Sequence, residues 1–262
     1  MPDPATMENL VGWLKGAGAG SVAGFASGML GVSSGGILVP VVCTAFGVDQ
    51  HLSQGVSLIV QIPPTSLAGY AQYRRHTRTF PVAWLAQLSA GSLAGGALGA
   101  LTATGMPDRM LRWLFVGYLL VLAALSLLRR RRAICGDDAP QARARWSALL
   151  AIGAAGGFSS GLLGIGGGLA VTALSTTLLH LGQHRAQALS LMLVALPLTA
   201  PAASVYVAQR LPLPWYSIIG IVFGLALGAA AGAALANRLP ERALRPAFTV
   251  LVVAMAAYMA TR

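Results

Sequence analysis

Long apolar runs, separated by short polar or basic gaps, constrain the fold of this chain more than any other feature. Each run approaches or exceeds the ~20 apolar residues that a transmembrane helix needs. Only 10% of the 262 residues are charged, so the chain lacks the polar shell of a soluble domain. The sequence therefore predicts an all-α polytopic membrane protein with about eight transmembrane helices. The runs cover residues 10–46, 52–73, 80–104, 110–128, 146–180, 186–208, 213–236 and 244–261.

Basic residues gather in the gaps between these runs and account for a net charge of +11. Lys and Arg in short loops mark the cytoplasmic side of a membrane protein, so the charge indicates topology and not binding to nucleic acid. The linker 129–145, which opens with Arg129–Arg132, and the loop Arg74–Arg78 are both expected to be cytoplasmic. Two spans separate them, which predicts a multi-pass protein of the inner (plasma) membrane with both termini inside.

The two halves of the chain align without a gap at a separation of 133 residues, which is the distance from Gly24 to Gly157. Internal repeats of this kind are typical of secondary transporters, whose binding site lies near the membrane midplane. Parallel and inverted repeats are both compatible with the sequence. The predicted organisation is an N-terminal tail (1–9), a first transmembrane repeat (10–128), a basic cytoplasmic linker (129–145) and a second transmembrane repeat (146–262), with four helices per repeat.

Clustered glycines interrupt the first apolar run of each half, at residues 31–40 (GVSSGGILVP) and 164–173 (GIGGGLAVTA). They predict that the first helix of each repeat is broken. A half-helix that starts after a break presents free N–H groups and a positive dipole end, which suits an anion. Tight packing of helices through small residues is the alternative explanation. The candidate substrate-binding residues at the breaks are Ser33, Ser34, Gly35, Gly36, Gly166, Gly167 and Gly168.

A polar stripe follows each break on the next apolar run. The side chains recur at steps of three and four residues, so they share one helix face. Substrate binding and hydrogen bonding between helices are both compatible with such a stripe. The stripes consist of Gln50, Gln54, Ser57, Gln61 and Thr65 in the first half and of Gln183, Gln187 and Ser190 in the second. The candidate substrate-binding residues among them are Gln54, Ser57, Gln61, Gln187 and Ser190.

Two histidines, His51 and His184, adjoin the stripes near the expected membrane edge. A proton-linked role and an ordinary interfacial histidine are both open for them. None of the seven acidic residues lies in an expected span, whereas cation and metal carriers need intramembrane carboxylates. The sequence therefore predicts an anion as substrate, with no metal site and no cofactor. An intramembrane enzyme would need a nucleophile beside a base, and only scattered Ser and His are present, so no catalytic residues are expected.

The glycine motifs resemble those of the TauE/SafE family, the sulfite exporters also called toluene sulfonate uptake permeases. Each half of that family opens with a G-x-G-G-G-x-x-x-x-P-type motif. The second half keeps its glycines but has Ala173 in place of the proline, and the first half keeps Pro40 but has Ser33 and Ser34 in place of two glycines.

The resemblance covers almost the whole chain. It implies a membrane transporter, commonly an exporter, of sulfite, sulfonates or related small organic anions. An importer or channel for an unrelated small solute is the alternative. The partners expected are the small anionic substrate and the lipid bilayer, and a homodimer is compatible with the sequence.

Overall fold

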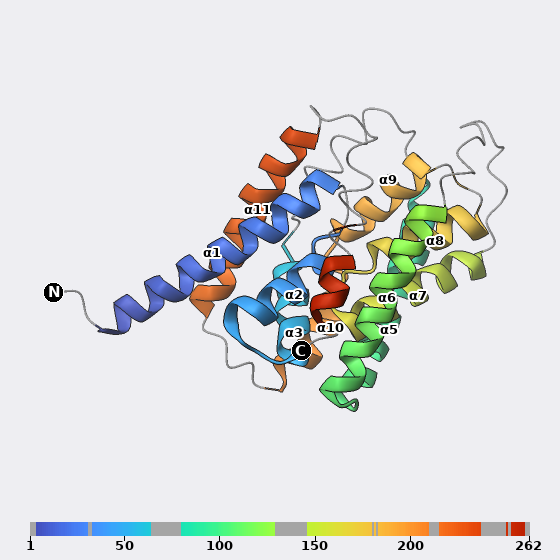
Figure 1. The fold of residues 1–262 in the computed structure, drawn as a ribbon. Coiled ribbons are helices and arrows are strands. Elements are labelled where there is room, and N and C mark those ends of the chain that lie inside the picture. Colours follow the sequence, from blue (N-terminus) through green and yellow to red (C-terminus); the bar gives the residue numbers. More distant parts are fainter. Residues whose placement is uncertain are drawn as a thin grey trace.

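A computed structural model describes residues 4–30, 33–63, 80–128, 146–179, 181, 183–209, 215–236, 250 and 253–259 (Figure 1). All regular elements in these ranges are helical, which confirms the all-helical class that the apolar runs predict. The helices are α1 (Pro4–Leu30), α2 (Gly35–Phe46), α3 (Gln50–Val60), α5 (Val82–Thr104), α6 (Asp108–Leu128), α7 (Trp146–Leu163), α8 (Gly168–Leu178), α9 (Gln183–Val194), α10 (Ala200–Val207) and α11 (Trp215–Ala236). Residues 253–259 form a further short helix. The linker 129–145 and the loop Arg74–Arg78 lie outside the described residues.

Several helix boundaries differ from those expected from the apolar runs. Helix α1 begins at Pro4, so most of the expected tail 1–9 is helical. The run 186–208 is divided between α9 and α10, and Pro197 lies in the gap between them. Proline interrupts a helix because it lacks an N–H group and its ring clashes with the preceding turn. The expectation of one continuous helix over this run is therefore wrong.

The breaks themselves lie where the glycines cluster. Helix α1 ends at Leu30 and α2 begins at Gly35, while α7 ends at Leu163 and α8 begins at Gly168. In the second break, Gly164, Gly166 and Gly167 have φ values of 71°, 82° and 58°. Only glycine adopts this left-handed region without strain, so the cluster is required by the shape of the loop.

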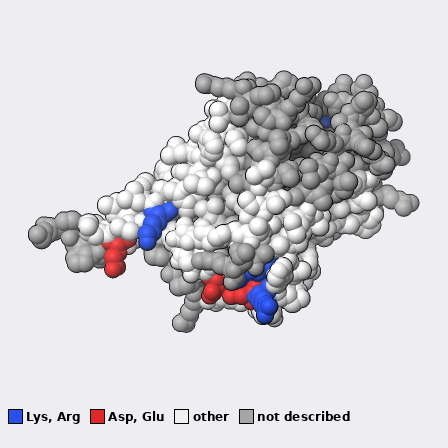
Figure 2. Space-filling model, viewed as in Figure 1, with Lys and Arg blue, Asp and Glu red and all other residues white. Residues whose placement is uncertain are grey.

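The outer surface is suited to lipid. Trp146–Leu163 and Trp215–Gly232 are long and apolar enough to cross a membrane. Large apolar side chains stand exposed along the helices, among them Val22 on α1 and Leu227 on α11, which is 69% exposed. Figure 2 shows a broad uncharged surface on this face, with charged side chains confined to a few places. Exposed apolar area on this scale marks a surface that meets a membrane.

Glycines set the distance between the helices of two long pairs, α1 with α11 and α5 with α7. On α1, glycines recur at every fourth residue from Gly16 to Gly28. A Cβ atom added to Gly20 would lie 2.2 Å from the carbonyl oxygen of Ile221, and one added to Gly224 would lie 2.1 Å from that of Ala17. The backbones are therefore in direct contact, as in other small-residue packing between membrane helices.

The two helix pairs make corresponding contacts. Gly24 faces the carbonyl of Leu225 across the α1–α11 pair, and Gly157 faces that of Ser92 across the α7–α5 pair. Both residues of the first contact are separated from those of the second by 133 positions, the separation that aligns the two halves. Each pair joins a helix from before the linker to one from after it. The halves are thus interlocked and do not form two separate bundles.

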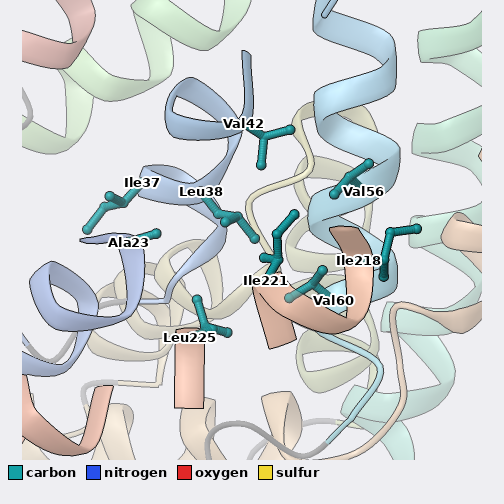
Figure 3. Packing of buried hydrophobic residues seen from close by; sticks show 9 residues of the cluster. All are labelled: Ala23, Ile37, Leu38, Val42, Val56, Val60, Ile218, Ile221 and Leu225. Atoms are coloured by element: carbon teal, nitrogen blue, oxygen red, sulfur yellow. The ribbon is translucent and has the colours of Figure 1, made fainter. Parts of the chain in front are cut away.

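An apolar core lies where α1, α2, α3 and α11 meet (Figure 3). Ala23, Leu38, Val60 and Leu225 are all fully buried or nearly so within it. This core fixes α2 and α3 against the α1–α11 pair, and so places the first glycine break and the first polar stripe at the centre of the molecule. The cluster consists of Ala23, Ile37, Leu38, Val42, Val56, Val60, Ile218, Ile221 and Leu225.

The glycine packing predicts different effects for two alanine substitutions on the same helix. Gly20→Ala should destabilise the protein by about 1–3 kcal/mol, because its Cβ would overlap the α11 backbone, which has no side-chain freedom to give way. Gly18→Ala should be neutral or stabilise by about 0.5–1 kcal/mol, because no atom lies within 4 Å of its Cβ position. Thermal unfolding of the purified protein in detergent measures both. Equal unfolding midpoints for the two variants would contradict the close contact of Gly20 with α11.

Candidate functional site

The loop 164–167, between α7 and α8, lies at the meeting point of the two halves. Ser33, just before α2, donates a hydrogen bond from Oγ to the carbonyl of Ile165 over 2.8 Å. A Cβ on Gly35 would lie 2.6 Å from the carbonyl oxygen of Gly164, so no larger residue fits there. The structure therefore brings the two glycine breaks into contact.

The polar stripe of α3 binds the same loop through hydrogen bonds. Ser57 donates from Oγ to the carbonyl of Gly164 over 2.7 Å. Gln61 donates from Nε2 to the carbonyl and hydroxyl oxygens of Ser57, at 2.9 and 3.0 Å. Gln54 is fully buried, and its backbone packs against Gly164. Gln61 Nε2 also lies 3.4 Å from the carbonyl oxygen of Gly164, so Ser57 and Gln61 hold this carbonyl group in place.

The second stripe contributes Ser190, whose Oγ donates to the carbonyl of Gly168 over 2.7 Å. Thr172 donates to the same carbonyl over 2.9 Å. The carbonyl groups of Gly164, Ile165 and Gly168 are thus all occupied by side-chain donors. The loop and the first turn of α8 therefore present few free acceptors, whereas the first N–H groups of a helix have no partner within it.

The remaining expected site residues are placed as follows. Ser34 caps α2 with its carbonyl, which accepts the N–H of Leu38 over 2.8 Å, and its side chain makes no capping bond. Gly36 faces Ile165 at an ordinary contact distance of 3.6 Å from its Cβ position. Gln187 and His184 lie on α9, but their side chains are outside the described part of the structure.

Some polar atoms in the described residues are buried without a hydrogen-bond partner, and two of them belong to residues that contact the loop. They include Nε2 of Gln54 and Oε1 of Gln61. A Cβ on Gly166 would lie 1.8 Å from that Gln61 oxygen, which shows how closely the amide approaches the loop. Tyr206 of α10, which the sequence analysis did not identify, donates from its hydroxyl to Gln54 Oε1 over 3.0 Å. The tyrosine at the aligned position, Tyr73, was a signal for it.

A partly open cavity adjoins the loop. Its walls come from α5, α7, α8, α9, α10 and the residues between α9 and α10, and they include Gly166, Gly167 and Gly168. The expected first-half residues Ser33, Gln54, Ser57 and Gln61 do not line it. They brace the loop from behind, so the expected residues lie together but face the cavity only in the second half.

The site holds hydroxyl, amide and backbone groups. Among the described residues there is no group of three or more His, Cys, Asp or Glu side chains that could hold a metal ion. Hydrogen-bond donors therefore dominate the chemistry available here, and such a set can bind an anion or a neutral acid.

A family model described as sulfite exporter TauE/SafE matches residues 16–259 of the chain. The chain belongs to the TauE/SafE sulfite exporter family. This confirms the resemblance drawn from the glycine motifs. The TauE/SafE family consists of membrane transporters and not enzymes, and it implies an exporter of the sulfite or sulfonate type. No curated protein and no solved structure matches the chain.

In this TauE/SafE protein, His51 lies at the opposite end of α3 from Gln61. Its Nδ1 is 2.5 Å from Oδ1 of Asp108, and its Nε2 is 2.9 Å from the carbonyl oxygen of Ala103. The Asp108 carboxylate and the Ala103 carbonyl thus hold the two ring nitrogens of His51 between α6 and the end of α5. The side chains of the pair are 24% and 37% exposed.

The loop geometry predicts opposite outcomes for two glycines of the breaks. Gly166→Ala should abolish transport, because residue 166 has φ +82° and its Cβ would overlap Gln61. Gly36→Ala should keep most of the activity, since its Cβ has room. Flux in reconstituted vesicles, normalised to the folded protein recovered, compares them. Full activity of Gly166→Ala would show that the loop does not adopt this conformation during transport.

Proposed function

We propose that this protein is a secondary transporter that exports sulfite, sulfonates or related small organic anions across the inner membrane. The observation that carries this proposal is the contact between the two glycine breaks, made by Ser33 with Ile165 and by Gly35 with Gly164. A binding site between two interlocked halves is the arrangement that alternating access requires, because the site can open to either side as one half moves against the other.

The polarity of the loop supports an anion as the substrate. Ser57, Ser33 and Ser190 occupy carbonyl groups that would otherwise repel negative charge. The N-termini of α2 and α8 both start at the breaks, at Gly35 and Gly168, and each carries the positive end of a helix dipole. A cation would meet this field without a carboxylate to compensate its charge.

The equivalent contacts of the two helix pairs support two four-helix repeats related by pseudo-symmetry. The pair Gly24–Leu225 and the pair Gly157–Ser92 have matching Cβ-to-carbonyl distances of 2.3 and 2.2 Å. In repeat transporters, exchange of two such conformations moves the substrate across the membrane. We propose that the short helices α2, α3, α8 and α9 act as paired half-spans in these repeats.

Flux measurements test the function. Purified protein in lipid vesicles should move labelled sulfite and a short alkanesulfonate, and should not move a quaternary amine or a divalent metal ion, because the loop offers donors and no carboxylate. Vesicles that contain Gly166→Ala protein supply the background, and the Gly36→Ala variant is the matched control. Transport of cations, or of unrelated neutral solutes at equal rates, would overturn the proposal and favour an importer or a channel.

Repeating the flux with and without a pH gradient tests whether His51 couples transport to protons. The contact between His51 and Asp108 supports this role, and the charged residues nearest to the pair in sequence are Asp49, just before α3, and Arg109 and Arg112 on α6. His51→Asn should reduce the response to the gradient and leave substrate affinity unchanged, because asparagine does not titrate. An unaltered response would identify His51 as an interfacial residue only.

Cys135 offers a direct test of the proposed topology, in which the linker 129–145 and both termini are cytoplasmic. The chain has two cysteines, and Cys43 is only 2% exposed and donates to the carbonyl of Val48. A membrane-impermeant maleimide should therefore label Cys135 in inside-out vesicles and not in intact cells. Cys135→Ser is the control for specific labelling. Labelling in intact cells would reverse the orientation.

A further inference from the structure

Two hydroxyl groups of the cavity have no use in the bracing of the loop. Oγ of Ser160, on α7, and Oγ1 of Thr199, between α9 and α10, are both buried without a hydrogen-bond partner. Both residues line the cavity, and Ser160 is only 6% exposed. Native proteins rarely leave buried hydroxyls unpaired, because each loses its hydrogen bonds to water without replacement. Such groups indicate a position that a ligand fills.

The N-terminus of α8 opens into the same cavity. Gly167 caps it with φ +58°, and a Cβ on Gly167 would lie 3.5 Å from the Cβ of Ser160. The N–H of Gly168 is turned back to the carbonyl of Gly166 and that of Val171 bonds to the carbonyl of Gly167, while the N–H groups of Leu169 and Ala170 have no acceptor one turn earlier within the helix. The two hydroxyls and this helix end form one cluster of donors, which we call the donor end.

The rest of the cavity wall is apolar. Val171, Leu193, Leu196 and Leu198 line it, opposite a floor of glycines from α5 and α7. A small inorganic oxyanion would use the donor end and leave this wall unoccupied. An anion with an apolar body would contact both the donor end and the apolar wall. Contact of the body with the wall removes apolar surface from water, which favours binding.

Side chains fill the region that is aligned with the cavity at a separation of 133 residues. Ser92, Gly156, Val171 and Leu193 of the cavity correspond to Leu225, Ala23, Leu38 and Val60. All four of these aligned residues are buried in the core of Figure 3. The cavity therefore has room at Ser92 and Gly156, where the aligned residues Leu225 and Ala23 have larger side chains.

We propose that the cavity binds an organic anion with a short apolar body, its oxyanion head at the donor end and its body against the apolar wall. The proposal rests on the proposed function and adds to it a location and a basis for selectivity. Ser160 and Thr199 bind the head, and the small side chains at positions 92 and 156 admit the body.

Calorimetric titration of purified protein with butane-1-sulfonate and with sulfite tests this assignment. Wild-type protein should bind the sulfonate more tightly than sulfite. Ser160→Ala and Thr199→Val should each weaken sulfonate binding by about 10-fold or more, the usual effect of losing a hydrogen bond to a charged group. Ser159→Ala is the matched control, because the Ser159 hydroxyl donates to the carbonyl of Gly156 and its residue does not line the cavity.

Ser92→Leu tests the apolar part of the site, since it installs the residue found at the aligned position 225. It should lower affinity for butane-1-sulfonate by about 10-fold or more and change that for sulfite less, because it fills the space of the body. Thermal unfolding confirms that each variant is folded. Thr199→Val preserves side-chain volume, so it keeps the test informative if Ser160→Ala fails to fold.

The outcomes separate the two proposals. If wild-type vesicles transport neither anion, the proposed function fails. If they transport anions but Ser160→Ala, Thr199→Val and Ser92→Leu bind the sulfonate as wild type does, the function stands and the cavity is not the site. Preference for sulfite over the sulfonate in the wild type would also overturn the cavity assignment.

Discussion

Direct backbone contact between helices is the constraint on which the rest of this structure depends. Lipid chains are as apolar as the helices they surround, so burial of apolar side chains contributes little to helix association, and close packing must supply the stability. Glycines such as Gly20 on α1 and Gly224 on α11 permit that packing. Because the α5–α7 pair repeats the arrangement, each half of the chain is held by a helix of the other. This interlocking brings the break before α2 against the break before α8.

The sequence was sufficient to predict what depends on neighbouring residues. The helical class followed from the apolar runs, and the broken helices followed from glycine clusters such as Gly164–Gly168, whose φ values suit glycine alone. The division of the run 186–208 at Pro197 was missed, although proline carries a local signal for it. The pairing of α1 with α11 could not be predicted from the sequence. Glycines at every fourth residue show that one face of a helix permits close packing, but they do not show which distant helix packs there.

The polar residues show the same limit. Their helical spacing correctly placed Gln54, Ser57 and Gln61 on one face, and the structure directs that face to the glycine loop. Periodicity shows which side chains share a helix face, but it does not show what that face contacts. It therefore did not distinguish side chains that brace the loop from side chains that line the cavity. Ser160 gave no such pattern, because it lies among the glycines of a packing face. Its place in the cavity wall becomes visible only when α5, α8 and α9 are assembled around it.

Bracing and binding are nevertheless linked through the polarity of the peptide groups. Each peptide of an unwound segment carries one donor and one acceptor, and both need partners in a membrane interior. Ser57 and Ser33 take the acceptors of Gly164 and Ile165 from the α3 and α2 side, and Ser190 takes that of Gly168. The unpaired backbone groups at the start of α8 are N–H donors. They create a positive local field without any charged side chain. The anion that we propose as substrate would meet these donors in a chain whose expected spans contain no carboxylate.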